Sequence, residues 1–264
     1  MYTLYKYPRT PHLDGSRFQP GDEDLRVVSL EHLAGRHLVV EEKLDGANSA
    51  VSFGDDGRLL LQSRGHFLDG GPREKHFGLL KAWATSVKAG LWDVLGSRFV
   101  MYGEWLYAKH TIFYDDLLHY FFEFDVLDKS SGRFLSTRDR RELLDGAPVL
   151  PAPVLYSGEV RPASRLESLI TPSAFQTSSW REALVAVCES KGLDAGRALR
   201  ETDPAGLMEG LYVKVEDGER VVGRFKFVRE SFRQAVDDSG EHWLNRPVIP
   251  NRLREGVDLF APRT

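Results

Sequence analysis

The strongest constraint on the fold of this chain is a succession of short β-branched and aromatic runs, separated by residues that favour turns. Runs of this kind occupy residues 37–43, 49–53, 59–63, 99–106, 120–127, 210–216 and 220–228. Each is long enough for one β-strand. Asp217-Gly218 joins the last two runs and favours a tight hairpin, and residues 54–57 supply a similar turn after the second run. Consecutive strands with tight turns predict antiparallel sheets.

Helical patterns are fewer, at residues 73–90, 138–145 and 180–190. In the third, apolar residues recur at helical spacing after a polar run at residues 177–179. Three prolines between residues 148 and 153 predict a loop within a domain. Because strands dominate and several are consecutive, the sequence predicts the α+β class with antiparallel sheets, and not a doubly wound parallel sheet.

The charge balance excludes one class of function. The 264 residues include 35 Lys and Arg against 39 Asp and Glu, so the chain lacks the positive charge that holds nucleic acid non-specifically. Any contact with nucleic acid must come from a local patch. Cys188 is the only cysteine, which excludes an internal disulfide, and no apolar run approaches the ~18 residues of a membrane span. With no apolar signal segment at residues 1–10, we expect a cytoplasmic protein without a membrane partner.

The segment Glu42 to Asn48, with the sequence EKLDGAN, contains the strongest candidate for a reactive group. Lys43 stands at the end of a predicted strand and precedes a glycine turn, so we expect its amine at the mouth of a pocket. A lysine amine is a nucleophile only when neutral, and burial or a nearby cation favours the neutral form. These residues alone leave open the alternative of an ordinary surface turn.

Five further segments have the composition expected around a nucleotide. They are Ser63-Arg64-Gly65, Tyr102-Gly103-Glu104-Trp105, Phe122 to Val126, Glu209 to Lys214 and Arg224-Phe225-Lys226. In order and rough spacing, the six segments resemble the motifs of the covalent nucleotidyltransferases, which include ATP-dependent ligases and mRNA capping enzymes. The resemblance covers about residues 40–230. It implies an antiparallel-sheet nucleotidyltransferase (adenylyltransferase) domain of the ATP-grasp-like ligase type.

The resemblance implies that Lys43 attacks the α-phosphorus of the nucleotide, releases pyrophosphate and becomes a lysyl-nucleotide, which requires an in-line approach. Arg64 would contact the sugar, the α-phosphate or the incoming nucleic-acid end, with a solvated surface charge as the alternative. Asn48 would orient the phosphate, and we expect Glu42 in the same nucleotide site.

Two residues on predicted strands would hold the nucleoside. Glu104 lies on an otherwise apolar strand, where an unpaired carboxylate is costly, and the resemblance assigns it to the ribose. Phe124 would stack on the base, although any of Phe121, Phe122 and Phe124 could instead belong to the core.

The resemblance places Asp125 and Glu209 near a divalent metal, Mg²⁺ or Mn²⁺, because hard oxygen ligands suit these ions. Pairing with Lys or Arg in the sheet is the alternative. Lys226 and Arg224 alternate with phenylalanines along one strand, share a face, and are expected to act in catalysis on the α-phosphate. The family usually has lysine at both positions, so Arg224 departs from its pattern. Lys214 is either a third nucleotide-phosphate ligand or a surface charge of the hairpin.

Within this superfamily the chain looks most like the small RNA ligases that seal a 3′-OH to a 5′-phosphate, including the phage nick-sealing type. The Lys-x-Asp-Gly-x-Asn motif, the run at residues 102–112 and the tail at residues 242–247 carry this likeness. After Lys226 only 38 of the 264 residues follow, too few for a C-terminal OB domain. We therefore expect a nucleotidyltransferase domain at residues 1–235 and a short C-terminal extension at residues 236–264.

The resemblance implies ligation in three steps: adenylylation of Lys43 by ATP, transfer of AMP to an RNA 5′-phosphate, and attack by an RNA 3′-OH. The expected partner is RNA, as a nicked duplex or broken ends. Candidates to contact it are Arg138, Arg140, Arg141 and the stretch Arg224 to Arg233. The alternatives are a DNA nick ligase, a capping-type guanylyltransferase, or a nucleotide- or RNA-binding module on the same fold that has lost catalysis. The oligomeric state stays open.

Overall fold

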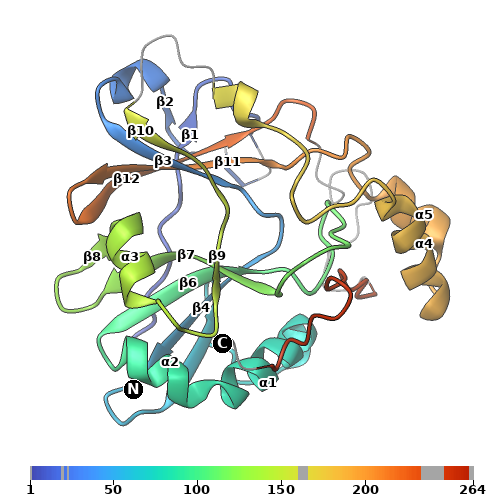
Figure 1. The fold of residues 1–264 in the computed structure, drawn as a ribbon, viewed down its shortest axis with the longest axis horizontal. Helices are drawn as coiled ribbons and strands as arrows, with labels where there is room; N and C mark the ends of the chain where they lie inside the picture. Colours follow the sequence, from blue (N-terminus) through green and yellow to red (C-terminus); the bar gives the residue numbers. More distant parts are fainter. Residues whose placement is uncertain (1, 19–20, 23, 160–165, 233–246, 262–264) are drawn as a thin grey trace.

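The architecture is one long, mostly antiparallel β-sheet whose two halves lie above and below a central space, with helices on the outside (Figure 1). The computed structural model describes residues 2–18, 21–22, 24–159, 166–232 and 247–261. Along the sheet the strand order is β10-β3-β11-β12-β8-β7-β6-β4-β5, and neighbours on this path pair antiparallel.

The upper half of the sheet consists of β10 (Val154–Glu159), β3 (His37–Glu42), β11 (Gly210–Asp217) and β12 (Arg220–Val228). The lower half consists of β7 (Phe121–Asp128), β6 (Phe99–Trp105), β4 (Ala47–Phe53) and β5 (Leu59–Ser63), and β8 (Arg133–Leu135) links the halves. Three two-residue strands pair in parallel beside this path: β1 (His12–Leu13) with β12, β2 (Val27–Val28) with β1, and β9 (Leu150–Pro151) with β7.

Helices cover the outer faces of the sheet. The helical elements are η1 (Leu30–Leu33), η2 (Pro72–Phe77), α1 (Gly78–Ser86), α2 (Lys88–Leu95), α3 (Thr137–Leu143), η3 (Leu166–Leu169), α4 (Trp180–Ser190) and α5 (Ala195–Arg200). On the lower half, α1 and α2 bury Leu80, Trp83 and Leu91 in the main core. Full burial of side chains of this size contributes roughly 1.5–3 kcal/mol each. A separate cluster joins α4 and α5 to Phe113.

The predicted α+β class and antiparallel arrangement are confirmed, and every predicted strand is present within one or two residues of its expected ends. The single helix expected at residues 73–90 is wrong, because η2, α1 and α2 divide this stretch and the last continues to Leu95. The expectation of a loop around the prolines missed β9 and β10. Both lie at the periphery of the sheet, where a proline without an N–H is tolerated.

Residues 247–261 pack beside the segment that follows β6. Ala108 forms a bridge with Pro250, and the Asn251 side chain bonds the Tyr114 N–H (2.9 Å) and the Leu106 carbonyl (2.7 Å). The expected border at residues 235/236 and most of the tail at residues 242–247 lie outside the described residues. No helix in the described part of the chain is both long and apolar enough to cross a bilayer.

Candidate active site

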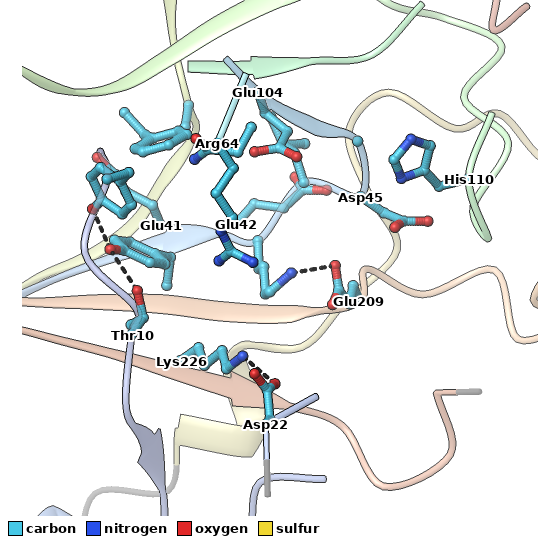
Figure 2. A pocket seen from close by; sticks show the side chains of 18 residues that line it. Thr10, Asp22, Glu41, Glu42, Asp45, Arg64, Glu104, His110, Glu209 and Lys226 are labelled. Atoms are coloured by element: carbon cyan, nitrogen blue, oxygen red, sulfur yellow. Dashed lines mark hydrogen bonds and ion pairs between the residues drawn. The ribbon is translucent and has the colours of Figure 1, made fainter. Parts of the chain in front are cut away.

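A cavity of about 350 Å³ lies between the two halves of the sheet (Figure 2). Eight of the predicted site residues line it: Glu42, Lys43, Asn48, Arg64, Glu104, Phe124, Glu209 and Lys226. They come from β3, β4, β6, β7 and β12, and from the residues directly next to β3, β5 and β11. Segments up to 180 positions apart in the sequence thus meet in one pocket, because the sheet bends around it.

Lys43 directly follows β3, and its backbone N–H donates to the carbonyl of Gly210 (3.0 Å). Its side chain is 22% exposed, and its Nζ lies 2.7 Å from Oε2 of Glu209. Burial alone would lower the pKa of this ammonium. The negative charges of Glu209, Glu104 and Asp45 outweigh burial and raise the pKa of Lys43 above its usual value. These charges therefore favour the protonated form of Lys43.

The turn after Lys43 is fixed by its own residues. The buried Asp45 carboxylate accepts hydrogen bonds from the backbone N–H groups of Thr111 and Ile112, both at 2.7 Å. A Cβ at Gly46 would lie 2.7 Å from the carbonyl oxygen of Trp105, so only glycine fits there. The motif thus ties the reactive lysine to the segment that follows β6, and the surface-turn alternative does not apply.

Glu104 and Asn48 face the pocket as a cross-strand pair of β6 and β4. Burial raises the pKa of Glu104 to about 8, and the charge of Lys43 only partly opposes this. Arg64 follows β5 and is exposed at the pocket mouth. One wall of the pocket therefore carries the carboxyl of Glu104 and the amide of Asn48, and the long cationic side chain of Arg64 lies at the rim.

Acidic side chains outnumber cations around the pocket. The lining carboxyls belong to Asp22, Glu41, Glu42, Asp45, Glu104 and Glu209, and the lining cations are Lys43, Arg64 and Lys226. Burial raises the pKa of Glu42 to about 7, and its Oε1 has no hydrogen-bond partner among the described residues. Such a pocket suits a ligand that brings cationic charge or hydrogen-bond donors.

Lys226 lies on β12, opposite Tyr212 of β11, and its Nζ forms an ion pair with Asp22. Burial lowers the pKa of Lys226 more than Asp22 raises it. Figure 2 shows this pair below Glu209 in the view. The sequence analysis predicted Lys226 but not its partner.

Three predicted site residues do not line the pocket: Asp125, Lys214 and Arg224. Lys214 is fully buried, with its Nζ 2.8 Å from Oε2 of Glu41. Arg224 Nε lies 2.9 Å from Oδ2 of Asp125, and its guanidinium stacks on the Phe134 ring at 3.6 Å. Asp125 therefore has two cationic partners, Arg224 and Lys214, which agrees with the alternative of pairing within the sheet. Lys214 is neither a pocket ligand nor a surface charge.

Arg140 is also removed from the candidates for RNA contact. It is fully buried, with NH2 2.6 Å from Glu41 Oε1 and NH1 3.3 Å from Glu123 Oε2. Arg140 and Lys214 both donate to the backbone carbonyl of Phe124. Three buried acids and three cations thus form a network that joins α3 to β3, β7, β11 and β12 beside the pocket, which Glu41 also lines.

Phe124 is the aromatic residue of its run that reaches the pocket. Phe121 and Phe122 are 0% and 1% exposed and belong to the main core, whereas Phe124 is partly exposed and lines the cavity. Its ring packs against Tyr7 at 5.2 Å and near Tyr212 at 5.9 Å. The ring is therefore held on one wall by neighbours and is open toward the cavity.

Sequence reasoning missed several lining residues: Tyr7, Thr10, Asp22, Glu41, His110 and Tyr212. Strand alternation could have indicated Tyr212, which is two positions from Lys214 on the same face. Burial lowers the pKa of His110 to about 4, so its imidazole is neutral. Nothing in the pattern of the N-terminal residues signals that they reach the pocket.

The chain belongs to the RNA ligase family, whose family description matches residues 36–228. No curated protein sequence matches the chain. Among solved structures, a ligand-free point mutant of the RNA ligase from Naegleria gruberi is 19% identical, with a TM-score of 0.51, over 76% of this chain and 52% of that one. A second ligand-free mutant of the Naegleria gruberi RNA ligase is 18% identical with a TM-score of 0.51, over 80% and 54%. A third mutant, solved with ATP and Mn, is 19% identical with a TM-score of 0.46, over 76% and 52%.

The first two structures establish a shared fold. The present chain spans about half the length of the solved chains that it matches. The matched family region begins at residue 36, so it includes β3 and Lys43 but not the N-terminal residues that line the pocket.

Proposed function

We propose that this protein is an ATP-dependent RNA ligase that joins RNA 3′-OH and 5′-phosphate ends through a lysyl-AMP intermediate on Lys43. The observation that carries the proposal is the position of Lys43, a pocket lysine whose ammonium faces Glu209 at 2.7 Å. Membership of the RNA ligase family supports this choice over a capping-type or DNA-specific enzyme.

In the first step, the Lys43 nitrogen forms a bond to the α-phosphorus of ATP while the bond from that phosphorus to the pyrophosphate oxygen breaks. Lys43 must lose a proton before it attacks, and the Glu209 carboxylate is the acceptor in contact with it. Lys226 lines the same pocket from β12, and can hold an α-phosphate oxygen in line with the attack.

In the second and third steps, AMP passes from Lys43 to the 5′-phosphate of RNA, and the RNA 3′-OH then displaces AMP to form the new phosphodiester. Arg64 is exposed at the pocket mouth, where it can contact the incoming RNA end. RNA as a nicked duplex or as broken ends is the proposed partner. Arg138 and Arg141 remain exposed candidates to contact it.

The nucleoside end of ATP is assigned to the other pocket residues. Phe124 offers a ring for stacking on the base, and Glu104 with Asn48 lies on the wall where ribose hydroxyls and phosphate can be bound. Glu42 has an unpartnered carboxyl oxygen that can accept from an exocyclic amine.

A divalent metal, Mg²⁺ or Mn²⁺, fits the excess of carboxyls, and when bound it would neutralise charge on the phosphates. In the described part of the chain, no three His, Cys, Asp or Glu side chains are grouped closely enough to hold an ion alone. Glu209 is the residue we assign to such an ion, with the remaining oxygens coming from water and phosphate, as is usual for Mg²⁺. Asp125 is not proposed, because its carboxylate is fully buried against Arg224 and Lys214.

We also propose that residues 1–235 form the nucleotidyltransferase domain, that residues 236–264 form a C-terminal extension, and that the enzyme acts in the cytoplasm. The contacts of residues 247–261 with the segment after β6 support an extension that packs on the domain. Expression of residues 1–235 alone tests the border. If the border is right, the shortened chain should fold but be less stable, because it lacks the contacts of Asn251.

The test of the proposed function is covalent labelling. The protein is first treated with pyrophosphate to clear any bound AMP, and then incubated with α-labelled ATP or GTP and Mg²⁺. Label that survives denaturation, comes from ATP alone and is lost in Lys43→Ala supports the proposal, and Lys88→Ala, an exposed lysine on α2, is the matched control. Label from GTP would indicate capping-type chemistry. No label with either nucleotide would overturn the enzyme in favour of a binding module.

A second assay separates the substrates. Adenylylated protein is given nicked duplexes with RNA or DNA at the 3′-OH side, and broken single strands. Sealing of RNA 3′-OH ends with release of AMP is the expected result. Equal sealing of all-DNA nicks would contradict the RNA assignment.

A further inference from the structure

The N-terminal segment before the family-matched region places a carboxylate inside the pocket. Asp22 lines the cavity and forms an ion pair with Lys226, and the two side chains are only 13% and 9% exposed. Figure 2 shows the Asp22 carboxylate turned toward the Lys226 ammonium. The Asp22 carboxylate is therefore paired with Lys226, the cation that the proposed function assigns to a phosphate.

A chain of hydrogen bonds fixes Asp22 in this position. The backbone N–H of Val228 donates to Ser16 Oγ (2.9 Å), and Ser16 Oγ lies 2.7 Å from His12 Nδ1. His12 Nε2 lies 3.1 Å from Asp22 Oδ2, the same oxygen that accepts from Lys226. The chain thus begins and ends on β12, and backbone pairing of His12 with Lys226 in β1 and β12 holds its two ends together.

The protons in this chain can be assigned from the charges. Burial raises the pKa of Asp22, but the hydrogen bonds and charges of Lys226 and His12 outweigh burial and hold it below its usual value, so Asp22 is ionised. Burial lowers the pKa of His12, which favours a neutral imidazole. An ionised Asp22 only accepts, so His12 donates from Nε2 and its Nδ1 accepts from the Ser16 hydroxyl. Each group has a partner, and His12 is fully buried and stacked on Phe18 at 4.6 Å.

We infer that Asp22 is a built-in competitor of the nucleotide phosphates for Lys226. The inference rests on the proposed function, which makes Lys226 a phosphate ligand. A phosphate that approaches Lys226 meets the Asp22 carboxylate already paired with the ammonium and competes with its negative charge, whereas a nucleoside without phosphate has no such competitor. His12 keeps the carboxylate beside the cation, so the pair re-forms when the phosphate leaves. Asp22 therefore weakens phosphate binding and favours release of AMP or pyrophosphate.

The experiment measures the affinity of three probes by calorimetry, with EDTA present to remove metals: inorganic pyrophosphate, AMP and adenosine. The variant Asp22→Asn keeps the shape and the oxygen that accepts from His12 but removes the charge that holds Lys226. Asp93→Asn is the matched control, since Asp93 is exposed on α2 and does not line the pocket. Melting curves establish that each variant is folded, and Asp22→Ser is a second variant with no amide against Lys226.

Asp22→Asn should bind pyrophosphate and AMP about tenfold more tightly than the wild type, which corresponds to about 1.4 kcal/mol, and adenosine unchanged. Asp93→Asn should match the wild type. In the Lys226→Met background the effect of Asp22→Asn on pyrophosphate should vanish, which a merely structural role of Asp22 would not produce. Pyrophosphate binding that is unchanged or weaker in Asp22→Asn would overturn the inference.

The adenosine and AMP arms separate this inference from the proposed function. If no variant binds adenosine or AMP, the proposed nucleotide site is wrong. Pyrophosphate binding then still tests whether Asp22 competes with phosphate for Lys226. If AMP binds and Lys43 is labelled but Asp22→Asn changes neither anion, the ligase proposal stands and the role of Asp22 is wrong.

Discussion

Replacing Glu104 by glutamine should make the ligand-free protein more stable and the enzyme less active. Burial raises the pKa of Glu104 to about 8, from 4.5 for an ordinary glutamate. The folded chain therefore keeps a proton that the unfolded chain has already lost, and the stability falls as the pH rises from about 4.5 to about 8. Glutamine resembles the protonated carboxyl in shape and does not titrate, so Glu104→Gln escapes this loss.

The magnitude follows from the same values. At about 1.4 kcal/mol per pH unit, the difference between 4.5 and about 8 corresponds to at most about 5 kcal/mol once the pH exceeds the upper value. Water in the pocket screens part of the charge, so we expect a gain of about 1–2 kcal/mol, or about 3–6 °C in Tm, at about pH 8.5. At about pH 5 the two proteins should melt together.

The assay compares melting curves of the wild type, Glu104→Gln and Glu142→Gln without nucleotide at both pH values. Glu142 is an exposed carboxylate on α3, so its variant should stay within about 0.5 kcal/mol of the wild type. In the labelling assay at about pH 8.5, where Glu104 is mostly ionised, Glu104→Gln should lose about tenfold or more, because glutamine is a weaker acceptor for ribose hydroxyls than a carboxylate. A variant that is destabilised at the higher pH would refute the reasoning that burial of this carboxylate is costly.

Four further changes test other parts of the structure. Arg140→Met should cost about 3–5 kcal/mol in urea unfolding, because Glu123 loses its cation inside the protein; a loss below about 1 kcal/mol would contradict the buried network. Gly210→Ala should fail to fold, because a Cβ there would lie 1.9 Å from the Phe227 carbonyl oxygen; a native circular dichroism spectrum would disprove this. Asn251→Ala should cost about 2–3 kcal/mol, seen as a lower Tm, since two buried backbone groups lose their partner; an unchanged Tm would speak against it. Labelling of Lys43 should accelerate from about pH 6 to about pH 9, because its raised pKa leaves little neutral amine; a flat profile would argue against attack by this lysine.

The strands could be predicted from the sequence because each leaves a local mark, a β-branched or aromatic run with a turn residue at its end. Strand β10 and the two-residue strands β1 and β2 were not predicted from the sequence, because their pairing depends on distant partners such as β3 and β12. The break between α1 and α2 at Val87 escaped for a related reason, because helical periodicity continues through a change in helix axis.

The residues of the candidate site also differ in how well the sequence predicts them. Residues such as Lys43, Glu104 and Glu209 belong to short motifs, and the order of those motifs predicted that they meet. Whether a charged residue faces the pocket or the interior depends on its neighbours across the sheet, which the sequence does not reveal. Lys214 and Lys226 lie on adjacent strands of one hairpin, yet Lys214 is paired with Glu41 and does not line the pocket, whereas Lys226 does.

Each proposed reactive cation of the pocket is paired with an acid: Lys43 with Glu209, and Lys226 with Asp22. Binding of a nucleotide is therefore an exchange of ion pairs, in which phosphates take the lysines and the freed carboxylates need new partners. A divalent cation can serve Glu209 in this exchange, so metal and nucleotide should each favour binding of the other. Asp22 differs because His12 retains it, outside the matched family region. The pocket thus contains two different acids: a metal can pair with Glu209 when the nucleotide takes Lys43, whereas His12 keeps Asp22 in place to compete with phosphate for Lys226.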